Sequence, residues 1–101
     1  MLIERNEFRI KFGHMKEALS LWKSLFDAFS ETKDHLKVRM MTDITGPSYT
    51  LIVELQLRSF QDLGFKAYQW HTNQKAHDIY LQVVPLCESC VRTLYNLEYE
   101  N

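Results

Sequence analysis

The chain has few of the features that mark several large classes of protein. Its three glycines are isolated from one another, so there is no glycine-rich loop of the kind that binds phosphate groups. No apolar run approaches the roughly 20 residues that span a bilayer, which argues against a membrane protein. The first ten residues, MLIERNEFRI, carry charges at alternating positions instead of the apolar block of a signal peptide. We therefore expect a cytoplasmic protein.

An excess of charge of either sign is also missing. The 12 Lys and Arg residues are balanced by 13 Asp and Glu residues, and the two signs are interspersed. Phosphate contacts need a basic excess on one face, so we expect no nucleic-acid partner. Apolar residues, by contrast, make up 46% of the chain and aromatic residues 13%. This length and composition predict a single domain over residues 1–101.

Cysteine is scarce, and the two cysteines form one C-x-x-C pair, Cys87 and Cys90. A redox pair of this spacing usually opens a helix, whose N-terminus stabilises the thiolate. Here Pro85 precedes the pair and a strand pattern follows it. A zinc site needs about four ligands, which His71 and His77 would have to complete. We expect two ordinary thiols and neither a metal nor another cofactor.

Hydrophobic periodicity predicts four strands and two helical regions. Period-two alternation marks the strands, and apolar residues at spacings of three and four mark the helices. A turn at Thr45-Gly46-Pro47 separates the two middle strands, and Pro85 ends the second helical region, which has a phase change near residues 72–73. In chain order we expect a strand over 2–12, a helix over 14–29, strands over 36–44 and 49–57, a helical region over 60–84 and a strand over 89–99.

This β-α-β-β-α-β order predicts a ferredoxin-like α+β fold. The sheet would be antiparallel with strand order 4-1-3-2, and both helices would cover one of its faces. Glu4 and Asn6 interrupt the apolar face of the first strand near its start, so we expect only the second half of this strand to be deeply buried. The residues that suit the covered face are Phe8, Ile10, Phe12, Leu51, Val53 and Leu55.

The opposite face of the sheet is mixed in character, which is typical of a face that is either solvated or buried against another subunit. We predict that it forms a dimer interface and that Arg9 pairs there with Glu54. Met41 and Leu94 are expected on this face or beside it. The predicted interface residues are Arg5, Glu7, Arg9, Ile52 and Glu54.

Residues 38–63, VRMMTDITGPSYTLIVELQLRSFQDL, resemble the hairpin and helix start of the dimeric α/β-barrel superfamily, and within it the small NIPSNAP-like proteins. The resemblance comes from a strand ending in Thr42-Asp43, a Thr45-Gly46-Pro47 turn, an apolar strand ending in Glu54 and a helix led by Ser59. The late segment PLCESCVRTLYNLE is similar to the family's ending. The order of elements matches along nearly the whole chain.

The resemblance implies a homodimer in which two sheets pack face to face, with a pocket between each sheet and its helices or the partner. Members of the superfamily include quinol-type monooxygenases, lactone isomerases, peroxidases and haem-degrading enzymes. We therefore expect a NIPSNAP-like homodimer that binds a small organic ligand. The alternative is a cofactor-independent monooxygenase or isomerase of the antibiotic-biosynthesis-monooxygenase type.

Candidate site residues follow from the position of that pocket. Catalytic candidates are His77, His71 and Trp70, and the wider ligand-binding set is Asn6, Trp70, His71, His77, Tyr80 and Tyr95. Asn6, Trp70 and His77 are similar to the set in haem-degrading relatives, although the spacing of seven residues between Trp70 and His77 is shorter than in that family. Haem binding is thus a third hypothesis. Arg5, Arg9 and Arg92 are expected in ion pairs between strands, with anion binding as the alternative.

Overall fold

The computed structural model describes residues 1–30, 37–58 and 73–101. The predicted loop before the second strand and the predicted helix over residues 60–72 lie outside these ranges, as do Trp70 and His71. Among the described residues no helix is long and apolar enough to cross a membrane. In chain order the elements are β1 (Leu2–Ile10), α1 (Met15–Ser30), β2 (Lys37–Thr42), β3 (Thr50–Leu57), α3 (Gln74–Val83), the 3-10 turn η2 (Val84–Leu86) and β4 (Cys87–Asn96).

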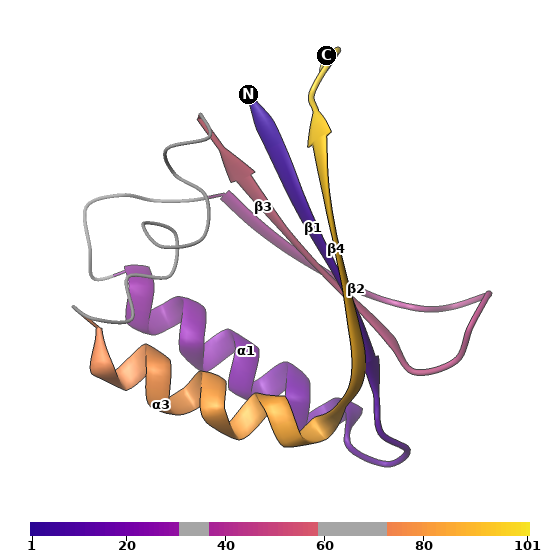
Figure 1. The fold of residues 1–101 in the computed structure, drawn as a ribbon, viewed down its shortest axis with the longest axis vertical. Coiled ribbons are helices and arrows are strands. Elements are labelled where there is room, and N and C mark those ends of the chain that lie inside the picture. Colours follow the sequence, from indigo (N-terminus) through magenta and orange to yellow (C-terminus); the bar gives the residue numbers. More distant parts are fainter. Residues whose placement is uncertain (31–36, 59–72) are drawn as a thin grey trace.

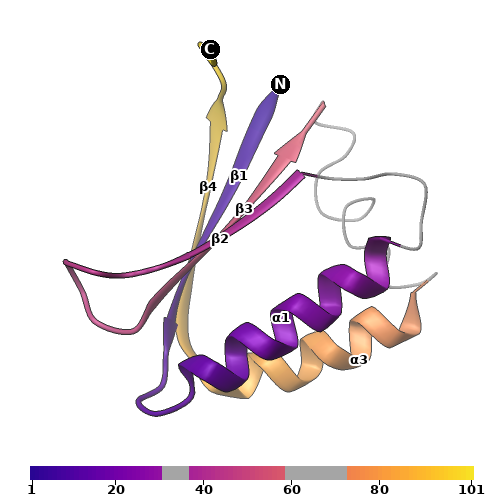
Figure 2. The same cartoon turned by 180° about the vertical axis from the view of Figure 1, so that it is seen from behind.

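The four strands form one antiparallel sheet in the order β2-β3-β1-β4, which is the predicted order read from the other edge. Helices α1 and α3 lie side by side on one face of this sheet (Figures 1 and 2). They approach the sheet where β1 ends and β4 begins, and they diverge from it toward the two chain termini. The predicted ferredoxin-like fold is confirmed.

Trp22 of α1 is at the centre of the core between the sheet and the helices. Its ring centroid lies 5.3 Å from that of Phe8 on β1, 5.5 Å from that of Phe26 and 6.4 Å from that of Tyr80 on α3. Such aromatic contacts add to the large apolar area that each ring buries. The apolar stripe predicted for the first helix therefore faces the sheet, and α3 packs against α1 at the same place.

Specific residues determine where helix α3 begins and where it ends. The Asn73 side chain accepts a hydrogen bond from the Ala76 amide at 3.0 Å, which caps the helix, and donates one to the Ala28 carbonyl at 3.0 Å. The second bond ties the start of α3 to the end of α1. At the other end Pro85 lies in η2, and β4 starts immediately afterwards at Cys87. The predicted end of the helical region at Pro85 is confirmed.

The β2–β3 connection is longer than the tight turn predicted at residues 45–47, because it covers residues 43–49. Asp43 Oδ1 closes this loop by accepting a hydrogen bond from the Thr50 amide at 2.9 Å. Gly46 has a φ of 99°, in the left-handed region that glycine adopts without a steric penalty.

Phe12 is not on the covered face, contrary to the prediction. Strand β1 ends at Ile10, and Phe12 lies in the following turn, 80% exposed, with its ring 5.3 Å from that of Tyr49. The alternation of β1 does not extend beyond the point where the chain leaves the sheet. Near the same point β4 has a bulge at Glu88. Arg9 pairs with Ser89 and Ile10 with Cys87, so Glu88 lies opposite no residue of β1 in the strand pairing.

Candidate functional site: a buried carboxyl between sheet and helices

The alternation of β1 divides its side chains between two faces of the sheet. Its even-numbered residues, Leu2 to Ile10, are all buried on the helix-covered face, while Glu7 and Arg9 are exposed on the open face. Glu4 and Asn6 have even numbers. Hence a carboxyl with 0% exposure and an amide with 3% exposure lie among residues that otherwise form the core. The expectation that only the second half of this strand is deeply buried is wrong, because the alternation of β1 carries its even-numbered residues to the covered face along its whole length.

Arg92 of β4 joins these two residues. It pairs in register with Asn6, so its side chain projects from the same face of the sheet. Its Nε lies 3.0 Å from Glu4 Oε1 and donates to Asn6 Oδ1 at 3.4 Å. The Arg92 side chain is 52% exposed, so the positive charge lies at the boundary between solvent and the buried carboxyl. We call these three residues the Glu4 cluster.

The Glu4 carboxyl is poorly satisfied. Within the described ranges neither of its oxygens has a hydrogen-bond partner, and the 3.0 Å approach of Arg92 Nε lacks hydrogen-bond geometry. Burial raises the pKa of Glu4, and the nearby Arg92 and Asn6 side chains offset only part of that rise. A buried group of this kind calls for an explanation, and a functional role is a common one.

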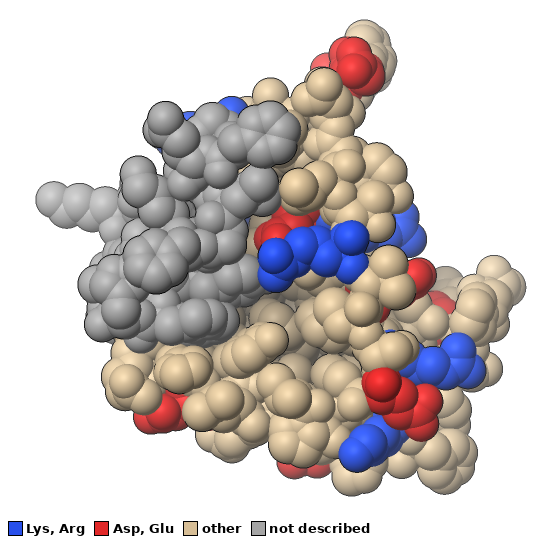
Figure 3. Space-filling model, in the orientation of Figure 1, with Lys and Arg blue, Asp and Glu red and all other residues tan. Residues whose placement is uncertain are grey.

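Strand β4 is an edge strand, and its helix-side residues beyond the bulge are exposed, whereas Cys87 at its start packs against the core. Cys90, Arg92 and Leu94 share the face of the Glu4 cluster, and all three are exposed. The cluster lies near the start of β1, toward the end of the sheet where the helices diverge from it (Figure 1). Figure 3 shows that, in the orientation of Figure 1, the charged side chains of the described residues are scattered and form no large patch of one sign.

The structure brings some of the predicted ligand-binding residues to one side of the sheet, but not all of them. Asn6 lies in the Glu4 cluster, and His77 and Tyr80 are half-buried on α3, on the helix side. Tyr95 pairs with Ile3 and therefore projects from the open face. A pocket on one face cannot be lined by both Asn6 and Tyr95.

The predicted interface residues are all on the open face, but the predicted pairing is wrong. Arg39 of β2 binds Glu54 at 2.7 Å, and Arg9 lies 3.6 Å from Glu88. Register explains this, because Glu54 lies opposite Arg5 and Arg39, whereas Arg9 lies opposite Thr50. Leu94 is a second correction, since it pairs with Glu4 on the helix-covered face.

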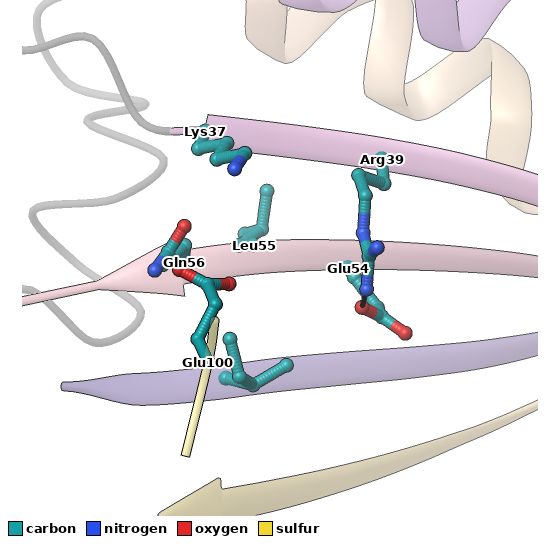
Figure 4. Close-up of a pocket in the computed structure, with 7 residues that line it drawn as sticks. Lys37, Arg39, Glu54, Leu55, Gln56 and Glu100 are labelled. Carbon is teal, nitrogen blue, oxygen red and sulfur yellow. Dashed lines mark hydrogen bonds and ion pairs between the residues drawn. The ribbon is translucent and has the colours of Figure 1, made fainter. Parts of the chain in front are cut away.

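A shallow depression of about 40 Å³ lies on the open face beside the Arg39–Glu54 pair (Figure 4). Glu100 of the C-terminal segment and Lys37 of β2 also line it. This volume accommodates no more than a few water molecules. The depression is therefore a feature of the charged sheet surface and is too small for an organic ligand.

The two cysteines fit the prediction of ordinary thiols. Both are free, and burial raises the pKa of the Cys87 and Cys90 thiols, which disfavours the reactive thiolate. No group of three or more potential metal ligands is found in the part of the chain that the structure describes.

The candidate site residues predicted from the sequence do not include Glu4, and Arg92 was expected only in ion pairs or in anion binding. A signal for Glu4 was present, since its parity in β1 matches that of Phe8 and Ile10. For Arg92 the missing information was the register between β1 and β4, which the bulge at Glu88 sets.

No protein-family model matches the chain, and no curated protein matches it. Solved structures do. A NIPSNAP domain protein from Burkholderia xenovorans has 14% identity and a TM-score of 0.80, with 96% of this chain and 94% of that chain covered. An antibiotic biosynthesis monooxygenase has 13% identity and a TM-score of 0.71, with 96% and 98% covered.

A third structure, a variant of SnoaB, a cofactor-independent oxygenase from Streptomyces nogalater, has 9% identity and a TM-score of 0.74, with 98% and 94% covered. At these identities the likeness shows a shared fold. The chain therefore has the ferredoxin-like fold of NIPSNAP-domain proteins and of antibiotic biosynthesis monooxygenases, as the sequence resemblance predicted.

The variant Glu4→Gln is expected to become more stable than the wild type as the pH rises. Because the native state holds the Glu4 proton more tightly than the unfolded chain does, the carboxyl favours folding below its unfolded-state pKa. This contribution is lost as the pH rises through the raised folded-state pKa. At neutral pH we expect Glu4→Gln to gain about 1 kcal/mol, or roughly 4–8 °C in Tm.

The measurement is Tm for the wild type and the variant from about pH 4 to about pH 8. Glu88→Gln, which removes an exposed carboxyl near the other end of β1, where Glu88 lies 3.6 Å from Arg9, is the control and should follow the wild type. If the Tm curves of Glu4→Gln and the wild type are parallel throughout, Glu4 does not have a raised pKa.

Proposed function

We propose that the protein is a homodimeric barrel that binds a small organic ligand at the Glu4 cluster. The observation that carries the proposal is the buried Glu4 carboxyl, which has no hydrogen-bond partner among the described residues. A bound ligand that donates a hydrogen bond would satisfy this carboxyl and remove much of the penalty of burying it.

The surroundings of the carboxyl favour an amphipathic ligand. The apolar helix-side residues of β3, Leu51 to Leu57, line the same face of the sheet, and Leu94 flanks Glu4 on the other side. Arg92 supplies a half-exposed guanidinium with a fixed orientation. Small-molecule sites commonly combine a mostly apolar wall with a few placed polar groups in this way.

The open face supports association with a second copy. It carries the exposed apolar side chains of Met41, Val91 and Tyr95 beside charged residues, of which Arg39 and Glu54 form an ion pair. Burial of this face against the same face of another copy would remove apolar area from water. The predicted interface residues lie at its centre.

A second candidate is a cofactor-independent monooxygenase that uses the same site, and the fold shared with SnoaB supports it. An oxygenase of this type needs an apolar pocket for an electron-rich substrate and polar groups that hold its oxyanion. Arg92 and Asn6 are of the right chemical types for the second task. Oxygen uptake with a panel of quinols distinguishes this candidate from a protein that only binds its ligand.

Binding of 2-naphthol, a small aromatic alcohol, is expected to depend on Arg92. A hydrogen bond to a charged group contributes about 1.5–3 kcal/mol, so Arg92→Gln should raise the Kd by about 10–100-fold. Ligand-observed NMR with titration measures this Kd. Arg9→Gln is the matched control, because Arg9 is 53% exposed and Arg92 52%, and both pair with a glutamate. Equal losses in the two variants, or no binding by the wild type, would contradict the proposed site.

Association is tested by light scattering at about 50 µM, a concentration at which a stable interface is expected to be saturated. We expect a dimer for the wild type and a monomer for Val91→Glu, which places an unpaired charge on the open face. Leu81→Glu on α3 is the control, because Val91 and Leu81 are 56% and 55% exposed. A monomeric wild type, or dissociation of both variants, would refute the proposed interface.

A further inference from the structure

We propose that Glu4 is a general base that removes a proton from a small, weakly acidic carbonyl compound, and that Arg92 holds the enolate that results. This inference rests on the proposed ligand site and names the substrate class and the reaction step of that site. Its first support is geometric, since the most deeply buried carboxyl of the described residues lies 3.0 Å from the half-exposed guanidinium.

The two oxygens of Glu4 differ in their surroundings. Oε1 is the oxygen that Arg92 Nε approaches, while Oε2 is buried without a hydrogen-bond partner in the described parts of the chain. A carboxylate oxygen without a partner in an apolar setting is a stronger proton acceptor than one in water, because desolvation disfavours its charged form. Oε2 is therefore the atom that would receive the proton.

Arg92 can stabilise the product of that transfer. Its contacts with Glu4 and with Asn6 both run through Nε, at the base of the guanidinium, and the side chain is half exposed. The two Nη groups are thus the part of Arg92 that a ligand would meet first. An oxygen that gains negative charge beside a guanidinium is stabilised more strongly than the neutral carbonyl oxygen before it, which lowers the barrier to the step.

The step is balanced without any further reactant. The C–H bond next to the substrate carbonyl breaks, its proton forms an O–H bond with Glu4 Oε2, and the electron pair moves onto the carbonyl oxygen beside Arg92. Return of the proton to the same carbon regenerates the substrate, and its return to another carbon gives an isomer. Either outcome restores the Glu4 carboxylate.

Among the described residues, the two thiols and the Glu54 carboxyl suit this role less well. The Cys87 and Cys90 thiols have raised pKa values and are poor nucleophiles at neutral pH. Glu54 is held by Arg39 at 2.7 Å on the open face, and the depression beside that pair is too small for an organic substrate. Glu4 is the carboxyl whose burial and lack of hydrogen bonds suit proton transfer.

The test is hydrogen–deuterium exchange at the carbon next to the carbonyl of 2-indanone and of 2-tetralone, followed by proton NMR in D₂O. We expect the wild type to accelerate exchange over buffer, and Glu4→Gln to lose about 10²–10⁴-fold of that acceleration, the usual contribution of a general base. Glu88→Gln is the control for an exposed carboxylate and should exchange like the wild type. Circular dichroism verifies that each variant is folded.

A pH profile separates a base from a structural residue. Only the carboxylate form accepts a proton, so exchange by the wild type should rise with pH and level off above the raised pKa of Glu4. Glu4→Gln should show no such rise. A flat wild-type profile, or equal exchange by the wild type and Glu4→Gln, would overturn the inference.

Saturation-transfer NMR on the same ketones distinguishes the failure of this inference from the failure of the proposed function. If the ketones bind in an Arg92-dependent way and exchange does not depend on Glu4, the ligand site stands and the base is refuted. If none of the ketones or 2-naphthol binds to the wild type, both the site and the base are refuted.

Discussion

The alternation of β1 is the constraint on which both faces of the molecule depend. This strand is hydrogen-bonded to β3 on one side and to β4 on the other, so it cannot slip by one residue without moving every side chain to the opposite face. The core prevents that slip, because Phe8 packs on Trp22 and Ile10 is almost fully buried. The same packing keeps the Glu4 carboxyl buried, although the loss of hydration disfavours its charged form. The position of the candidate site is thus a consequence of apolar packing at the other end of the strand.

The burial of Glu4 makes the fold less stable than an apolar residue at that position would. Partial compensation comes from Arg92, but the guanidinium is half exposed and its approach to Oε1 is not a hydrogen bond. Asn6 on β1 accepts a hydrogen bond from Arg92 on β4, and this bond between the two strands helps to hold the guanidinium in position. This arrangement lowers the stability of the fold and holds a carboxyl with a raised pKa in a fixed position. That exchange is typical of functional sites, where charged groups are held in environments that perturb them.

Much of the fold could be predicted from the sequence, because it follows from local patterns. Period-two alternation and the stripe around Trp22 predicted the order of elements, and the rules for connections between strands then favoured the strand order that the structure has. The errors all concern register and strand ends. In β4 both faces carry a mixture of apolar and polar residues, so alternation alone does not say which face meets the helices, and Leu94 was placed on the wrong one. The bulge at Glu88, which sets the register, has no clear signal in the sequence.

The Glu4 cluster could be predicted only in part for the same reason. Glu4 and Asn6 share the parity of the core residues, and this signal indicates burial, but their polar character led to the expectation that this half of the strand is less deeply buried. Their contact with Arg92 depends on a pairing between residues that are 86 positions apart. Similarly, Arg9 and Glu54 do share a face, but they are four register positions apart along β1, and Arg39 lies directly opposite Glu54. Composition and periodicity contain no information about such distances along a strand.

The two faces of the sheet would separate the proposed ligand binding from the proposed association. All three residues of the Glu4 cluster come from one chain and project toward the helices, whereas Val91, Met41 and the Arg39–Glu54 pair project the other way. A second copy on the open face would therefore contribute no atom to the cluster. Neighbours in sequence such as Glu4 and Arg5 point to opposite faces, so a substitution at one of them changes one surface directly and reaches the other only through the backbone of β1. A loss of association need not be a loss of the site, and each property can be altered while the other remains.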